Sequence, residues 1–192
     1  MINLETAADH FKDHVATFTD LGNIKILDFK NPDSNEYRIR FLFEEDYYRL
    51  HISGDLGELI ACNYKNMRYE EFFDFVNSTG YFEEKVRTHS RPFYVYDYER
   101  AKEELRDYLD LEDFSATFDF ETPEKLRNEK IEEILEDFDD ERGIGSRGYD
   151  ILSEIKSDCY EFISDIGKER TGIIELYMMA FELAYDQIEE AK

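Results

Sequence analysis

Apolar and polar side chains alternate between residues 24 and 64, and this two-residue period constrains the fold more than any other feature of the chain. Such alternation is typical of strands with one buried and one exposed face. The alternating runs cover residues 24–27, 37–43, 48–53 and 58–64. Turn-forming residues lie between them at 31–35 and 44–46. The pattern predicts an antiparallel meander of about four strands, whose apolar face needs a helix packed against it.

Helical spacing of apolar residues flanks this region on both sides. An N-terminal helix is predicted from Ala7 to Phe18, with Gly22 as its stop. Thr122-Pro123-Glu124 is a strong helix start, because it offers an N-cap oxygen, a proline at the first position and an acid near the positive end of the dipole. Further helices are predicted around residues 72–76, 101–109, 131–138, 152–166 and 173–184.

The predicted fold class is therefore α+β, with the N-terminal helix packed on the meander and an acidic helical half after it. We divide the chain into residues 1–92, the helix and meander, and residues 93–192, the helical region, packed together as one domain. Two short apolar segments, 92–96 and 115–120, are expected to form extra strands or packed loops.

The chain is strongly acidic, with 47 acids, 23 bases and a formal net charge of -24 in 192 residues. Residues 97–141 contain 19 of the acids and only 6 of the bases. Nucleic-acid binding depends on Lys and Arg that replace counterions, so direct DNA or RNA binding is disfavoured, as is attraction to anionic lipid. The aromatic content of 16% nevertheless indicates a packed core instead of disorder.

Cysteine usage and the N-terminal sequence bear on where the protein acts. Cys62 and Cys159 are the only two cysteines and lie far apart in sequence, which fits a reduced, intracellular setting. The N-terminus lacks the basic and apolar regions of a signal peptide, and no stretch has the length of a membrane span. We expect a cytoplasmic protein of a bacterial host cell.

A literal G-x-G-x-x-G pattern occurs at 143–148, but it follows an acidic segment and no strand. Neighbouring carboxylates would repel a dinucleotide phosphate, so a flexible connection between two helices is the better interpretation. Asp137, Asp139 and Glu141 also match the first ligands of a calcium loop. Arg142 and Gly148 stand where that loop needs its glycine and its final glutamate, so a dedicated calcium site is not expected.

No complete catalytic signature is present, and we expect neither an enzyme nor a cofactor. His10 and His14 are spaced to share a metal if both lie on one helix, but no third ligand is evident and both are expected near the surface. His51 has no nucleophile or carboxylate partner that the sequence identifies. A small basic island at 87–91 contains Arg87, His89 and Arg91.

The acids recur at helical spacing and form the main candidate binding surface. Carboxylates three or four residues apart on a helix have Cβ atoms about 5–6 Å apart, close to the roughly 7 Å between phosphates along one DNA strand. Few lysines compensate them at i,i+4, so we interpret them as a surface for a basic partner, against the alternative of a solvated face. The residues are Glu103, Glu104, Asp107, Asp110, Glu129, Glu132, Glu133, Glu136, Asp137 and Asp140.

Two segments of the meander, Tyr37–Phe41 and Tyr48–Glu58, resemble a group of small phage and mobile-element proteins. In that group a strand ends in a Gly-Asp-aromatic/aliphatic-Gly turn, here Gly54-Asp55-Leu56-Gly57. The resemblance covers roughly residues 31–64 and implies a context but no site residues. In size, charge and lack of catalytic residues the chain is also similar to acidic phage inhibitors of host defence, including anti-CRISPR and anti-restriction proteins.

Three functional hypotheses follow. The first is an anti-CRISPR protein of the DNA-mimic type that occupies the Lys/Arg-lined groove of a Cas effector. Reversal of Glu132, Glu133, Glu136 and Asp137 to Lys is expected to abolish this inhibition with the fold intact. The second is a phage protein that binds another protein through its sheet and the Arg87–Arg91 island, with the acids as a solubility device. Salt adaptation in a halophile is a separate explanation of the acidity, against which the aromatic content argues. The third is a metal-dependent carboxylate enzyme.

Overall fold

The computed structural model describes residues 2–114 and 122–192. The chain forms two compact units, each with its own apolar core. Unit 1 comprises Met1–Phe93 with Thr171–Lys192, and unit 2 comprises Tyr94–Arg170. Unit 2 is therefore inserted in the sequence of unit 1. The fold class is α+β, as the sequence predicts.

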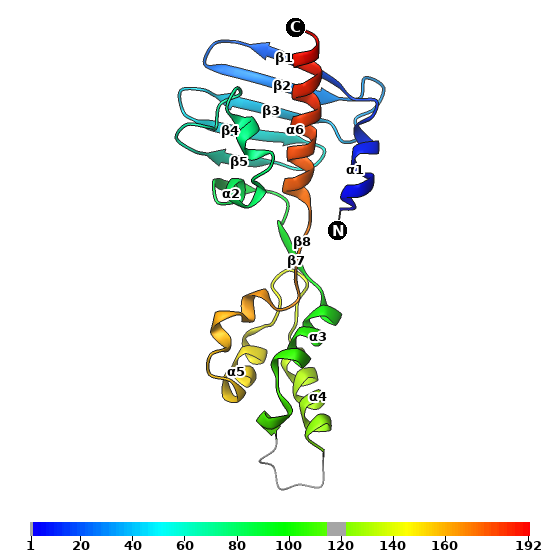
Figure 1. Ribbon diagram of the computed structural model, residues 1–192, viewed down its shortest axis with the longest axis vertical. Coiled ribbons are helices and arrows are strands. Elements are labelled where there is room, and N and C mark those ends of the chain that lie inside the picture. The colour runs from blue at the N-terminus through cyan, green and yellow to red at the C-terminus, as the bar shows by residue number, and fades with distance from the viewer. Residues whose placement is uncertain (1, 115–121) are drawn as a thin grey trace. The chain divides into compact units, whose positions relative to one another are not determined.

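Unit 1 contains a six-stranded antiparallel sheet whose strands lie side by side in chain order (Figure 1). The strands are β1 (Val15–Asp20), β2 (Ile24–Lys30), β3 (Ile39–Glu44), β4 (Arg49–Gly54), β5 (Leu59–Cys62) and β6 (Val86–His89). The antiparallel meander is thus confirmed. The expected number of about four strands is wrong, because β1 and β6 extend the sheet at its two edges.

The N-terminal helix is shorter than its apolar spacing predicts. α1 (Leu4–Phe11) ends well before Gly22, and the residues after it form β1. Ala16 and Phe18 pack against the core, while Val15, Thr17 and Thr19, which alternate with them, are exposed. The three-residue spacing of Val15 and Phe18 fits a helix, whereas the two-residue spacing of Ala16 and Phe18 fits a strand. The intervening threonines and valine, which are β-branched, favour the strand.

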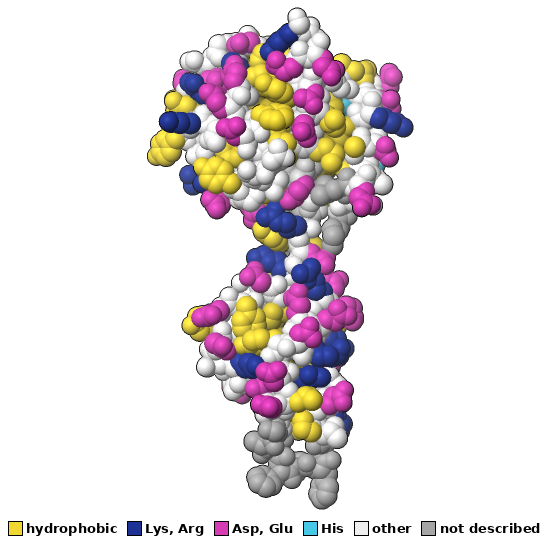
Figure 2. Space-filling view, viewed as in Figure 1, with side chains coloured by type: hydrophobic (Ala, Val, Ile, Leu, Met, Phe, Trp, Pro, Cys, Tyr) yellow, Lys and Arg dark blue, Asp and Glu magenta, His cyan; other side chains and the backbone are white. Residues whose placement is uncertain are grey.

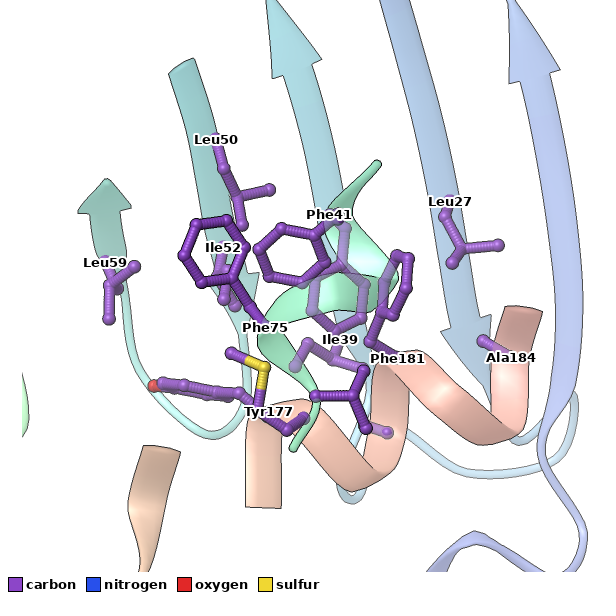
Figure 3. Close-up of a cluster of buried hydrophobic side chains, with 14 of the residues drawn as sticks. Leu27, Ile39, Phe41, Leu50, Ile52, Leu59, Phe75, Tyr177, Phe181 and Ala184 are labelled. Atoms are coloured by element: carbon purple, nitrogen blue, oxygen red, sulfur yellow. The ribbon is translucent and has the colours of Figure 1, made fainter. Parts of the chain in front are cut away.

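The C-terminal helix α6 (Ile173–Glu190) covers one face of the sheet (Figure 1). Phe41 of β3 and Phe181 of α6 meet edge to face with ring centroids 5.4 Å apart, and the Phe72 and Phe181 ring centroids are 4.7 Å apart. Figure 3 shows these α6 and strand side chains converging on one apolar cluster. Short helices η1 (Phe72–Phe75) and α2 (Thr79–Glu83) add further aromatic rings to it. The helix that the sheet requires is therefore mainly the last one in the chain.

The Gly54-Asp55-Leu56-Gly57 turn, on which the phage resemblance rests, has a structural role. Gly54 has a φ of 146°, and a Cβ there would lie 2.2 Å from the carbonyl oxygen of Arg38. The Asp55 carboxylate accepts a hydrogen bond from the backbone N–H of Tyr37 at 3.0 Å. The turn therefore fixes the start of β3 against the end of β4, and the motif is explained by the fold.

An amide side chain from α6 closes part of the β1 edge. The Gln187 Oε1 atom accepts a hydrogen bond from the N–H of Ala16 at 2.9 Å, and its Nε2 donates to the carbonyl of His14 at 3.0 Å. Gln187 thus takes the place of a neighbouring strand at that point.

Unit 2 is mainly helical. Its elements are β7 (Tyr94–Tyr96), α3 (Tyr98–Tyr108), η2 (Leu111–Phe114), α4 (Pro123–Ile134), α5 (Ser146–Ile155), η3 (Cys159–Glu161), η4 (Ile163–Asp165) and β8 (Lys168–Arg170). β7 and β8 pair as a two-stranded antiparallel sheet. Leu105, Ile131 and Leu152 contribute one buried residue from each of the three α-helices to its core. The predicted segment 92–96 is partly a strand, and segment 115–120 lies outside the described residues.

The sequence predicts one boundary at residue 92, with a single helical region after it. In the structure the first boundary between the units lies between Phe93 and Tyr94, but the chain returns to unit 1 at Thr171. The physical reason is the apolarity of α6, which buries Ile174, Tyr177, Phe181 and further residues against the sheet.

His10 and His14 do not share a helix face. α1 ends between them, and His10 stacks on Tyr37 with ring centroids 4.2 Å apart. The expectation that both lie near the surface is wrong for His14, whose exposed fraction is 4%. The Phe11 and Phe29 rings contact its ring, and the backbone of Glu36 and Tyr37 lies near it, but no described residue forms a hydrogen bond of normal geometry with either ring nitrogen.

We predict that His14 makes unit 1 less stable in mild acid. Burial lowers the pKa of His14 from 6.5, against smaller raising effects from the backbone of Tyr37 and Glu36 and the charge of Asp13. The folded state then binds fewer protons than the unfolded state, so this contribution to the free energy of unfolding falls as the pH drops below 6.5, by at most about 1.4 kcal/mol per pH unit.

The free energy of unfolding can be measured by denaturant titration at a series of pH values below 6.5. It should fall less steeply with decreasing pH for His14→Phe than for the wild type. The other histidines contribute equally to the pH dependence in both proteins, so their contributions cancel when the two slopes are compared. Equal slopes would contradict the prediction.

Candidate acidic interface

Unit 2 carries the denser negative charge. Its sequence contains 25 acids and 11 bases, compared with 22 acids and 12 bases in the longer unit 1. On the face visible in Figure 2, Lys and Arg side chains lie among the acids instead of apart from them. The arrangement of the pairs therefore decides which carboxylates remain free for a partner.

Seven of the ten predicted interface acids are neutralised or held by the chain's own groups. Glu104 pairs with Arg100 at 2.7 Å, Glu129 with Lys125 at 3.5 Å, Glu133 with Lys130 at 2.5 Å, Glu136 with Arg147 at 2.6 Å, and Asp110 with Lys156 at 3.2 Å; Glu132 pairs with Lys102, and Asp137 accepts backbone hydrogen bonds. Only one lysine among the described residues pairs with these acids at i,i+4, as the sequence predicts, but an arginine at i,i+4 and bases at other spacings neutralise most of the rest. Arg100–Glu104 and Lys125–Glu129 are both i,i+4 pairs.

Glu132 connects two helices of unit 2. Its carboxylate binds the ammonium of Lys102 and accepts a hydrogen bond from the Tyr98 hydroxyl at 2.9 Å. Lys102 and Tyr98 lie on α3, whereas Glu132 lies on α4. These two contacts lower the pKa of the Glu132 carboxyl. Glu132 is therefore a structural residue of unit 2.

Asp137 supplies the anion at the N-terminus of α5. Its two carboxylate oxygens accept hydrogen bonds from the N–H groups of Arg147 at 3.0 Å and Gly148 at 3.1 Å. The N-cap residue Gly145 has no side chain to do this, and a Cβ there would lie 2.2 Å from the Asp137 carboxylate. The glycine pattern therefore makes room for an internal carboxylate, which takes the position a phosphate would need.

The same segment connects the helices α4 and α5, as the sequence predicts, and it forms several internal hydrogen bonds. The Asp139 carboxylate accepts from the N–H groups of Glu141 and Arg142, and its backbone pairs with Gly143. The Asp137 and Asp139 carboxylates, which would be the first two ligands of the calcium loop, therefore already accept backbone hydrogen bonds.

The unpaired acids of α3 form a single stripe. Glu99, Glu103 and Asp107 are exposed, and none has an ion-pair or hydrogen-bond partner for its carboxylate among residues 2–114 and 122–192. They are four residues apart, so successive carboxylates rise about 6 Å along the helix. Asp140 is the remaining predicted acid that is free in the described structure. Glu99 is the member of the stripe that the sequence-based list leaves out.

The two remaining histidines lie in different surroundings. His51 lies 3.3 Å from the Glu44 carboxylate, and His89 stacks on Phe93 at 4.0 Å. Among the described residues, no three of His, Cys, Asp or Glu converge as metal ligands. In the basic island, Arg87 and Arg91 are exposed and form no ion pair with a described acid. No helix within the described ranges is long and apolar enough to cross a membrane.

One surface feature has no signal in the sequence pattern. Tyr48, Tyr64 and Tyr81 line a hollow of about 690 Å³ in unit 1. The Arg68 guanidinium lies 5.1 Å from the Tyr48 ring, and the Lys85 ammonium lies 4.1 Å from the Tyr81 ring. The chain's own cations thus already cover faces of two of the three rings. The three tyrosines come from separate segments, so only the fold brings them together.

No family model, curated protein or solved structure matches the chain.

We predict that Asp137→Ala destabilises unit 2 by about 0.5–2 kcal/mol, the usual cost of losing an N-cap side chain. Asp140→Ala, at an exposed acid three residues away, is the matched control and should change stability by less. Hydrogen exchange of the α5 amides measures both effects. Equal protection of α5 in the two variants would show that Asp137 does not cap the helix.

Proposed function

We propose that the protein inhibits a nucleic-acid-binding host defence enzyme, an RNA-guided CRISPR effector in the leading case, by placing unit 2 in its basic groove. The observation that carries the proposal is the stripe of Glu99, Glu103 and Asp107. These carboxylates are available without the loss of any internal contact, whereas most other acids of unit 2 already have partners.

The spacing of the stripe supports this assignment. A rise of about 6 Å per carboxylate is close to the roughly 7 Å between phosphates of one DNA strand. Lys and Arg side chains that contact successive phosphates could therefore contact successive carboxylates. Charge complementarity of this kind mainly raises the association rate and sets the orientation.

Affinity beyond charge needs apolar anchors, because exposed ion pairs contribute little each. Unit 2 exposes Leu111, Tyr149 and Tyr160, with exposed fractions of 45%, 40% and 63%. Aromatic side chains at such positions are typical of residues that dominate binding energy. We propose that they supply the packed contacts of the complex.

The structure changes the choice of test residues. Reversal of Glu132 or Asp137 would break the α3–α4 link or the α5 cap, so a loss of inhibition could reflect unfolding of unit 2. The stripe avoids this difficulty, because its side chains have no partner in the described structure.

We predict that E99K/E103K/D107K weakens inhibition of DNA cleavage by a purified guide-loaded effector at least about tenfold. The control is D33K/E36K/E190K, which makes the same change in net charge at exposed acids of unit 1. Inhibition by the wild type should also weaken as salt is added.

Each failure of this experiment has a separate meaning. A wild type that neither binds nor inhibits the effector would exclude that partner. Equal loss of inhibition in both triple variants would show that net charge matters and the stripe does not. A stripe variant as potent as the wild type would leave the acids as a solvated face.

A further inference from the structure

The face of the unit 1 sheet opposite α6 has apolar residues where a solvated sheet carries polar ones. A row of directly paired residues crosses all six strands on this outer face. Its members, from β1 to β6, are Thr19, Ile26, Leu42, His51, Ile60 and Thr88. Ile26, Leu42 and Ile60 belong neither to the core nor to the residues packed against it. No described residue of unit 1 packs over them as α6 packs over the inner face.

The outer face is also hollowed. Two depressions of about 550 and 430 Å³ lie on it and share Arg40, Ser53 and Glu58. Leu42, Ile60 and His51 line the larger one. The hollowed part of the outer face is therefore apolar in the larger depression, at the centre of the sheet, and polar in the smaller one.

Free positive charge gathers at that polar end. Lys30, Arg38 and Arg40 line the smaller depression. Arg40 is held by Asp28 through two hydrogen bonds of 2.7 and 2.9 Å, but Lys30 and Arg38 are exposed and have no ion-pair partner among the described residues. Among the described residues that line this depression, Glu58 is the one acid without an ion pair. The smaller depression thus has more free bases than free acids, in a chain whose net charge is -24.

We infer that the outer face binds a segment of a protein partner that carries both acidic and apolar side chains. Apolar side chains of the segment pack into the Leu42–Ile60 hollow, and its carboxylates pair with Lys30 and Arg38. Charge complementarity selects this occupant, since a basic segment would meet two unpaired cations. This site is separate from the acidic stripe of unit 2 and does not depend on the function proposed for it.

The size of the face suits such a segment. Six strands of four to seven residues, about 4.8 Å apart and rising about 3.3 Å per residue, present roughly 500 Å². This area is somewhat below the roughly 800 Å² per partner of a standard stable interface. A short peptide or a single strand or helix of a larger partner fits it better than a broad globular surface.

To test the inference, peptides that bind the immobilised full chain are selected from a display library of short random sequences. We expect enrichment of peptides that combine Asp or Glu with Leu, Ile or Phe. Binding of a selected peptide should weaken about tenfold for K30E/R38E and for Leu42→Ser. The control K12E/K65E makes the same charge change at two exposed lysines away from this face and should bind as the wild type does. Because all these side chains are at least partly exposed, circular dichroism should show folded variants.

Four results would overturn the inference. The library could yield no consensus, or a basic one, or peptides that bind K30E/R38E as well as the wild type. The fourth is a wild-type dimer in sedimentation velocity that Leu42→Ser dissociates, because the occupant would then be a second copy of the chain.

Discussion

Unit 1 depends on the burial of α6 against the six-stranded sheet. An antiparallel sheet with one apolar face is unstable until that face is covered, and most of the cover comes from the last helix in the chain. Phe181 contacts aromatic rings from both β3 and η1, and the Tyr177 hydroxyl donates a hydrogen bond to the carbonyl of Leu56 at 3.0 Å. Strands from the first third of the sequence are thus stabilised by residues that follow the whole of unit 2.

The sequence predicts what local periodicity controls and misses what distant segments decide. The central strands and the start of α6 after Gly172 follow directly from apolar spacing and glycine placement. β1 is misread because its apolar residues fit two periods, and only pairing with β2 selects one. β6 is short and polar, so it becomes a strand only because β5 offers it a free edge. Apolar periodicity cannot reveal that unit 2 is inserted in unit 1, because the insertion depends on which surface α6 covers.

The candidate site shows the same limit. Counting acids and bases along the sequence identifies unit 2 as the acidic part, but it cannot show which carboxylates are free. Glu132 and Lys102 are thirty residues apart, and Asp137 meets α5 through a turn that looked like a flexible linker. The sequence pattern already places Glu99 on one acidic helix face with Glu103, four residues later, but it does not show that both are free. Much of the negative charge in unit 2 is therefore part of its internal structure.

Gln187 has a consequence for how the sheet meets other chains. An edge strand with unpaired N–H and C=O groups is a template on which a foreign strand can add, and β1 has neither proline nor lysine to discourage this. By occupying the N–H of Ala16 and the carbonyl of His14, the Gln187 amide removes two contacts that such a strand would make. The last helix therefore leaves fewer backbone groups free at this edge, as well as covering the core.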